Sequence, residues 1–111
     1  MATTYKILAQ SAPTATTATL LYGPVGSGLS TIISTIYVCN RGSAAATYRI
    51  SVRQAGDADA TKQYLVYDAS VPANSTATYT HGLTLAATDS IYVYASNGNL
   101  SFNAFGSEVS A

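Results

Sequence analysis

The residue types that usually carry chemistry are few in this chain and poorly spaced for it. His81 is the only histidine, and no recognisable nucleophile motif accompanies it, although a Ser–His–acid relay needs both. Cys39 is the only cysteine, so one chain cannot supply the three or four nitrogen and sulfur ligands of a zinc site. Asp57 and Asp59 have the spacing of two calcium ligands, but the further acids of a calcium loop do not follow. We therefore expect no enzymatic activity, no metal site and no cofactor.

The aromatic residues suggest recognition instead. There are nine tyrosines, two phenylalanines and no tryptophan, and tyrosine is enriched where proteins meet, because an apolar ring carries a polar tip. Strand alternation places several tyrosines opposite the expected core, where they either form an interface or close the second side of the same sandwich. A tyrosine patch could also stack on sugars. The residues expected at an interface are Tyr5, Ile33, Tyr37, Tyr92, Tyr94 and Phe105.

The element that must position these residues is a long strand over residues 30–40. It contains no charged residue and is rich in β-branched side chains, which suit a pleated, half-buried surface. Strict alternation would place Ile32, Ile36 and Val38 on one face, and Ile33 and Tyr37 with two threonines on the other. Such a strand at an open edge would invite aggregation. We expect it in the middle of a sheet, with its second face against another protein.

The remaining sequence indicates short strands separated by turns. The predicted strands cover residues 5–10, 17–22, 46–54, 62–67 and 76–81, followed by strands around Ile91–Ala95 and Leu100–Ala104. Asn97-Gly98 predicts a type I′ hairpin that pairs these last two strands. About eight strands at this spacing predict an all-β, single-domain antiparallel β-sandwich, or a jelly-roll-like fold, over residues 1–111.

Composition excludes several partners. Charged residues make up 9% of the chain, with five basic and five acidic residues, against roughly 25% in an average domain. Nucleic-acid binding is not expected, because it depends on clustered lysine and arginine at phosphates. No segment approaches the roughly 20 apolar residues of a membrane helix, so no membrane partner is expected either. The N-terminus lacks the pattern of a secretory signal, which predicts synthesis in the cytoplasm.

Six segments together resemble a family of small virion structural proteins of tailed bacteriophages, notably those of cyanobacteria and aquatic bacteria. They span essentially the full length: MATTYKILAQ (1–10), STIYVCNR (34–41), YRISVR (48–53), KQYLVYD (62–68), LTLAATD (83–89) and SFNAFGSE (101–108). The resemblance implies a location in the virion and no catalytic residues.

Taken with that resemblance, the sequence predicts a capsid cement or decoration protein on the outside of the assembled phage head. The expected partners are copies of itself, as a homotrimer, and the phage major capsid protein. Residues 1–6 and 105–111 would become ordered on that partner. Two alternatives stay open: a tail, baseplate or fibre-attachment subunit, whose partners would be tail or baseplate proteins, and a sugar-binding module that acts at the host surface.

Overall fold

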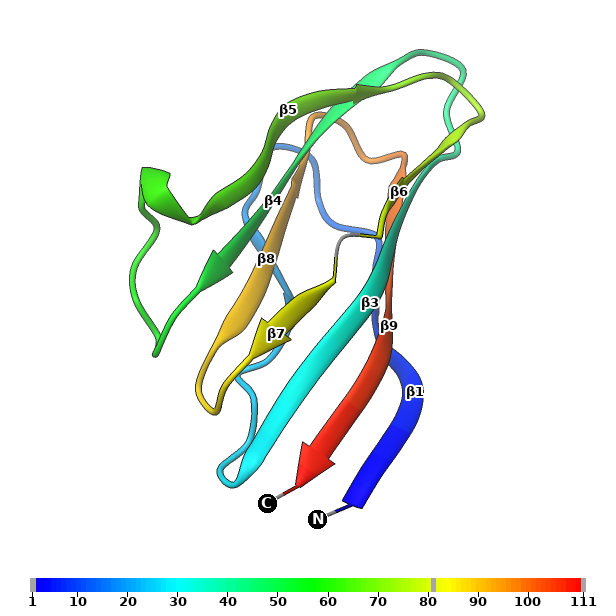
Figure 1. Cartoon of the computed structure of the whole chain (residues 1–111). Helices are drawn as coiled ribbons and strands as arrows, with labels where there is room; N and C mark the ends of the chain where they lie inside the picture. The colour runs from blue at the N-terminus through cyan, green and yellow to red at the C-terminus, as the bar shows by residue number, and fades with distance from the viewer. Residues whose placement is uncertain (1, 81, 111) are drawn as a thin grey trace.

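A computed structural model describes residues 2–80 and 82–110, which form a single domain of two antiparallel sheets (Figure 1). His81, considered above for a catalytic relay, lies outside the described residues. The elements are β1 (Ala2–Ser11), β2 (Thr19–Tyr22), β3 (Leu29–Asn40), β4 (Ala46–Arg53), the short 3₁₀ helix η1 (Thr61–Gln63), β5 (Tyr64–Val71), β6 (Thr76–Tyr79), β7 (Leu83–Leu85), β8 (Ser90–Ala95) and β9 (Leu100–Ser110).

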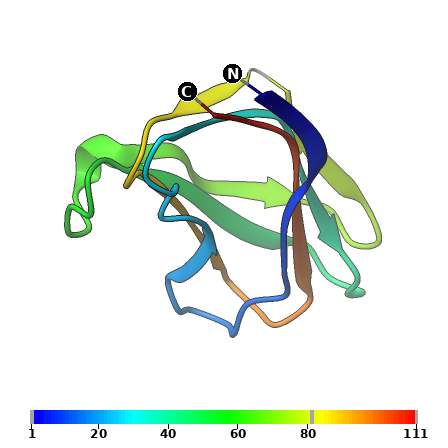
Figure 2. The same ribbon diagram turned by 90° about the horizontal axis from the view of Figure 1, so that it is seen from below.

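The strand order is that of a jelly roll. The first sheet runs β1-β9-β3-β6, with β7 also paired to β3, and the second sheet runs β2-β8-β4-β5. The chain thus folds back on itself, so that β1 pairs with β9, β2 with β8, β3 with β6 and β7, and β4 with β5. This long hairpin is then wrapped into two layers, which Figure 2 shows from one end. The predicted all-β sandwich is confirmed, with nine strands rather than about eight.

The core lies between the two sheets. Strand β3 is central in the first sheet, with β9 on one side and β6 and β7 on the other, as its sequence predicts. Phe102, near the start of β9, is fully buried, and its ring contacts that of Tyr48 from the second sheet at 6.3 Å between centroids. Ile91, Val93 and Ala95 of β8 point inward as predicted. Alternation therefore places most of the core correctly.

A β-bulge in β3 overturns the predicted assignment of its faces. Ile33 pairs with Gly106 and Thr35 with Phe105, so Ser34 is an extra residue in β3. One extra residue reverses which face every later side chain occupies. Below the bulge the buried residues are Thr31 and Ile33, and above it they are Ile36, Val38 and Asn40. Ile32 consequently lies on the outside, not with Ile36 and Val38.

The predicted hairpin at Asn97-Gly98 is wrong. Strand β8 belongs to the second sheet and β9 to the first, so this segment crosses between layers. Neither Asn97 nor Gly98 has the positive φ that a type I′ turn requires. Instead, the Asn97 side-chain oxygen accepts a hydrogen bond from the Asn99 backbone N–H at 2.9 Å, which turns the chain locally.

The segments 2–6 and 106–110 already form strands within the single chain. Ala2 pairs with Ser110 and Thr4 with Glu108, so residues 2–6 and 106–110 lie side by side in the first sheet. The expectation that these segments become ordered only on a partner is therefore wrong for the described residues. No helix in the described part of the chain is long and apolar enough to cross a membrane.

Candidate interaction surfaces

The two outer faces of the sandwich differ in charge. Along the registers of β1, β9 and β3, every position on the outer side of the first sheet carries an uncharged residue. The outer side of the second sheet carries two arginines, one aspartate and several tyrosines on β4, β5 and β8. We call these the uncharged face and the charged face. Arg41 lies at the upper rim of the uncharged face, where its Nε donates to Ser101 Oγ at 2.8 Å.

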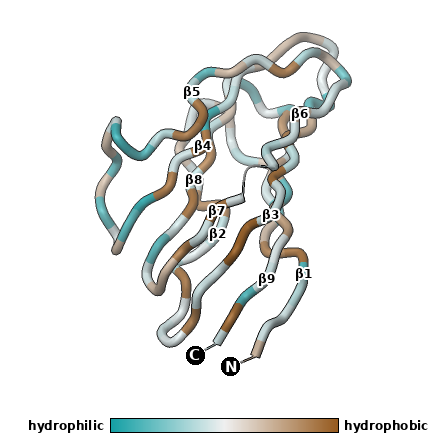
Figure 3. Tube along the Cα trace, viewed as in Figure 1, coloured by the Kyte–Doolittle hydropathy of each residue, from teal (hydrophilic) through white to brown (hydrophobic). Residues whose placement is uncertain are grey.

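The uncharged face exposes several large apolar side chains. Tyr5 is 83% exposed, Ile7 55%, Ile32 45% and Tyr37 43%, and Phe105 is half-buried among them. Cross-strand pairing aligns them, because Tyr5 and Ile32 flank Ser107 from either side. The hydropathy colouring of Figure 3 shows apolar segments in all three strands. The bulge therefore moves Ile32 from the core to this surface.

Two shallow grooves cross the uncharged face and share Phe105. The upper groove, of about 470 Å³, is lined by Tyr37, Cys39 and Phe105 with polar neighbours. The lower groove, of about 760 Å³, has Gly106 and Ser107 among its lining residues, with Tyr5 and Ile32 at its sides. Tyr37 and Phe105 meet edge to face, with ring centroids 5.7 Å apart. Cys39 is thus half-buried in a surface groove rather than in the core.

The charged face is built around Arg49. Its guanidinium carbon lies 4.2 Å from the ring centroids of both Tyr67 and Tyr94. The same group donates two hydrogen bonds to Asp68, at 2.7 and 3.2 Å. These bonds hold the pKa of the Asp68 carboxyl below its usual value. Stacking and ion pairing together fix the orientation of Arg49.

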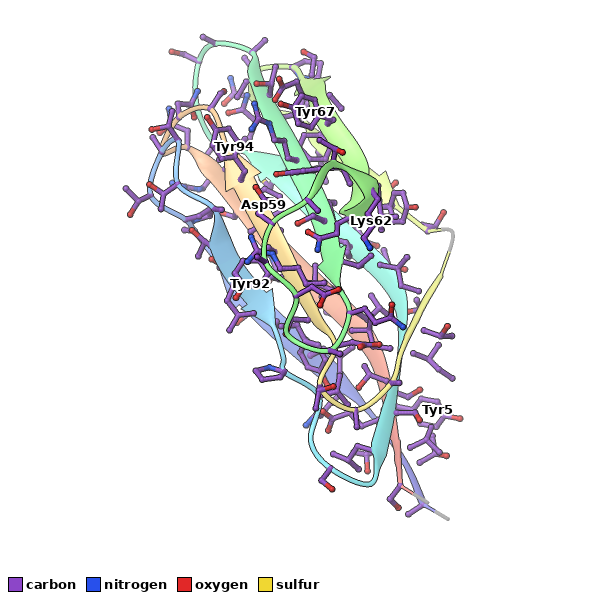
Figure 4. All side chains as sticks on the ribbon, turned by 90° about the vertical axis from the view of Figure 1, so that its left-hand side faces the viewer. Tyr5, Asp59, Lys62, Tyr67, Tyr92 and Tyr94 are labelled. Carbon is purple, nitrogen blue, oxygen red and sulfur yellow. The ribbon has the colours of Figure 1, made fainter. Side chains whose placement is uncertain are left out.

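A second arginine repeats the arrangement lower on the same face. The Arg53 guanidinium carbon lies 3.6 Å from the ring centroid of Tyr92, and an Nη atom lies 3.9 Å from Asp59. Tyr64 donates a hydrogen bond to Asp59 at 3.0 Å; burial and then this contact raise the pKa of the tyrosine. In Figure 4, Tyr67, Tyr92 and Tyr94 lie along the sheet that faces the viewer, while Tyr5 lies apart, near the chain ends.

The six predicted interface residues therefore do not form one site. Tyr5, Tyr37 and Phe105 lie together on the uncharged face, whereas Tyr92 and Tyr94 lie on the charged face beneath arginines. Ile33 is only 1% exposed, so its side chain cannot contact a partner. Sequence reasoning missed Ile7 and Ile32. Alternation in residues 5–10 places Ile7 on the same face as Tyr5, but nothing in the sequence locates the bulge that exposes Ile32.

A polar cluster closes the lower end of the sandwich. The Tyr22 hydroxyl from β2 donates to Glu108 on β9, and Glu108 also pairs with the Lys6 ammonium of β1 at 2.7 Å. The Tyr22 hydroxyl lies 2.9 Å from Thr31 Oγ1. Contacts first with Lys6 and then with Tyr22 lower the pKa of the Glu108 carboxyl, and burial is the main cause that raises the pKa of Tyr22. This cluster joins the two sheets.

The acidic loop does not form a metal centre. Asp57 and Asp59 are both exposed, and Asp59 is engaged with Tyr64 and Arg53. Among the described residues, no group of three or more histidine, cysteine, aspartate or glutamate side chains could hold a metal ion. A hollow of about 370 Å³ opens beside this loop, with Leu83 and Leu85 in its lining and Arg53 and Lys62 among its polar neighbours.

No protein-family model, curated protein or solved structure matched the chain.

Proposed function

We propose that the protein is a non-enzymatic structural subunit of a phage virion, a cement or decoration protein on the outside of the assembled head. The observation that carries the proposal is the uncharged face, where Tyr5, Ile7, Ile32, Tyr37 and Phe105 are presented by three adjacent strands. Clustered apolar exposure of this kind marks protein–protein contact sites on otherwise polar surfaces. The partner in contact with it would be the major capsid protein.

The physical mechanism is cross-bridging by many copies. Aromatic and aliphatic side chains on a rigid sheet lose little conformational entropy on docking, because the strands already hold them. Each contact can be weak, since neighbouring copies on a lattice act together. A subunit that binds only the assembled lattice stabilises it by mass action. The absence of net charge lowers repulsion between closely spaced copies.

The fold is compatible with this function but does not select it. Jelly rolls occur in viral capsid proteins, and also in lectins and cupins, and function depends on the site rather than on the fold. The sequence resemblance to phage virion proteins adds support from a separate direction. The alternative is a tail or baseplate subunit that uses the same face.

The sugar-binding alternative would use the charged face. Tyr92 and Tyr94 are half-buried, with a guanidinium on one side of each ring, whereas Tyr67, on which Arg49 also stacks, is the most exposed of the three. Tyr67 is 60% exposed beside Arg49 and Asp68, which could donate and accept hydrogen bonds with hydroxyls. A sugar site would therefore centre on Tyr67. Binding of a glycan array that is lost in Tyr67→Ala would favour this alternative over the capsid contact.

The test of the proposal compares two matched double variants by the number of copies that each binds per phage particle. Tyr37→Asp with Phe105→Asp places two charges on the uncharged face, and we expect at least a tenfold loss of bound copies per particle. The control is Leu20→Asp with Leu65→Asp, which adds the same charges at exposed leucines on β2 and β5. Its loading should match that of the wild type. Equal loading of both variants would contradict the role of the uncharged face.

Electron cryo-microscopy of intact virions then separates the alternatives. Density for this jelly roll in hundreds of copies over the head would establish the cement role. Density confined to a ring or fibre at the tail would support the baseplate alternative instead. Absence from the particle would overturn both.

A further inference from the structure

We infer that β1 is a self-association edge, which pairs antiparallel with β1 of a second copy of this chain. The inference rests on the proposed function and deepens it, because it assigns how copies join before or during assembly. It depends on backbone chemistry rather than on apolar exposure alone. The first sheet ends at β1, and no other strand of the described chain pairs with the outer side of that strand.

Strand β1 is long and open to solvent. It pairs with β9 from Ala2 to Ser11, and every residue from Ala2 to Ile7 is exposed. Figures 1 and 2 place it at the margin of the first sheet. An edge strand presents a row of unpaired N–H and C=O groups, and another extended strand matches their spacing. The chemistry of the edge therefore specifies a β-strand as its occupant.

The other edges of the two sheets are short or irregular. The other side of the first sheet ends in β6 and β7, of four and three residues, and β2 has four residues. Strand β5 has eight residues, but its pairing with β4 shifts register twice, and Asp68 within it has a positive φ of 55°. Bulges, brevity and charge are the means by which proteins block unwanted pairing at an edge.

Only one of these protections, the charge of Lys6, occurs in the first half of β1. It contains no proline, and its single register shift lies beyond Ile7. Its one charged residue is Lys6, whose ammonium is engaged by Glu108 at 2.7 Å. Lys6 alternates with Tyr5 and Ile7, so it points away from the uncharged face. The only long regular edge in the described structure is thus protected by a single charge, which is already paired within the sheet.

A second copy is the occupant that fits this edge best. Antiparallel pairing of two identical strands presents the same surface from both sides and closes on a two-fold axis. With the two-fold axis at Tyr5, the Tyr5 rings of the two copies would face each other, and Ile7 of each copy would face Thr3 of the other; such aromatic and β-branched cross-strand pairs stabilise a sheet. The two uncharged faces would merge into one continuous surface. The resulting assembly is a dimer, in place of the trimer expected from the sequence.

The first experiment measures the mass of the purified protein, in the absence of phage particles, by light scattering after size exclusion. We expect twice the 11.4 kDa of one chain at about 100 µM. Tyr5→Lys combined with Ile7→Lys places charges at exposed positions of the edge and should reduce the mass to that of one chain, while a single cooperative thermal melt shows that the variant is still folded. A monomeric wild type, or a trimer, would overturn the inference.

Disulfide trapping identifies the edge directly. In a Cys39→Ser background, Thr3→Cys, Thr4→Cys and Tyr5→Cys are oxidised one at a time, and at least one should give a covalent dimer within minutes. The control is Ser70→Cys, at an exposed position of the β5 edge, which should remain a monomer. Trapping at Ser70→Cys but at none of the β1 positions would contradict the assignment.

These outcomes are distinguishable from those of the proposed function. A Tyr5→Lys, Ile7→Lys variant that is monomeric but loads particles normally would show that assembly does not need edge pairing, and would confine the capsid contact to Ile32, Tyr37 and Phe105. A wild-type dimer linked through β1 that never appears in virions would support the edge and overturn the virion role.

Discussion

The backbone carbonyl oxygen of Ile32 occupies the place where a β-carbon on residue 106 would stand. Position 106 therefore accepts only glycine, although its φ lies outside the positive range that favours glycine. The close approach occurs beside the extra residue Ser34, where β3 bulges against β9. The same bulge turns Ile32 outward and Ile33 inward. The close contact between the Ile32 backbone and Gly106 thus accompanies the bulge that separates buried Ile33 from exposed Ile32.

Replacement of Gly106 by alanine should destabilise the protein. The added methyl group would overlap the Ile32 backbone, which cannot move without disturbing the ladder, so we expect a loss of about 1–3 kcal/mol. Urea unfolding measures the change. The control is Gly98→Ala. Apart from its chain neighbours, no atom lies within 4 Å of a β-carbon added to Gly98, and its φ is not positive. A Gly106→Ala variant as stable as Gly98→Ala would refute the close approach.

The neighbouring isoleucines should respond in opposite ways to truncation. Ile33 is 1% exposed, so Ile33→Ala leaves a cavity and should cost about 2–5 kcal/mol. Ile32 is 45% exposed, and Ile32→Ala should cost less than about 1 kcal/mol. Thermal melts of the two variants provide the comparison. Unbroken alternation along β3 would reverse the order, with Ile32→Ala the more damaging.

Asn40 fastens the upper end of the sandwich. Its Nδ2 donates to the carbonyl oxygens of Ala44 and Val71, and its Oδ1 accepts from the Gly42 N–H, at 2.9–3.1 Å. The side chain is 1% exposed. Loss of one buried and two part-buried hydrogen bonds in Asn40→Ala should cost about 3 kcal/mol. Asn103→Ala, where no side-chain hydrogen bond is found, should stay within about 0.5 kcal/mol of the wild type in the same denaturation assay.

Glu108 should make part of the stability dependent on acid pH. Lys6 and Tyr22 hold its pKa below the ordinary value of 4.5, so the folded state favours the ionised carboxyl. That contribution is complete above the unfolded pKa and is lost as the pH falls through the lower, folded pKa. Glu108→Gln should therefore be less stable than the wild type at neutral pH. The difference should narrow below about pH 4, as measured by urea unfolding across the acid range; a constant difference would contradict the linkage.

The lower cluster matters to the edge as well as to stability. Lys6 belongs to β1 and Glu108 to β9, so their pairing holds the first half of the edge strand on the sheet. The same contact keeps the ammonium engaged away from the uncharged face. The Lys6–Glu108 ion pair thus both stabilises the first sheet and holds its edge strand in place.

Sequence reasoning succeeds where local pattern and tertiary environment agree. Ile91, Val93 and Ala95 alternate inward as predicted, and residues 30–40 form the expected central strand. It fails at Asn97-Gly98, whose composition favours a tight hairpin although the chain crosses between sheets there. Turn propensity is worth little against the burial of Leu100 and Phe102 in the other layer. Local preference gives way because the larger energy lies in long-range packing.

The amino-acid sequence by itself determines an all-β chain with little charge and a long central strand. Its β-branched residues, turns and composition are local properties, and they act through backbone geometry and side-chain solvation. Only the tertiary structure decides which apolar residues are exposed. That choice depends on the bulge at Ser34, on Gly106 beneath Ile32, and on the arginines that cover Tyr92 and Tyr94. Each is a contact between residues distant in sequence, and strand periodicity carries no information about such contacts.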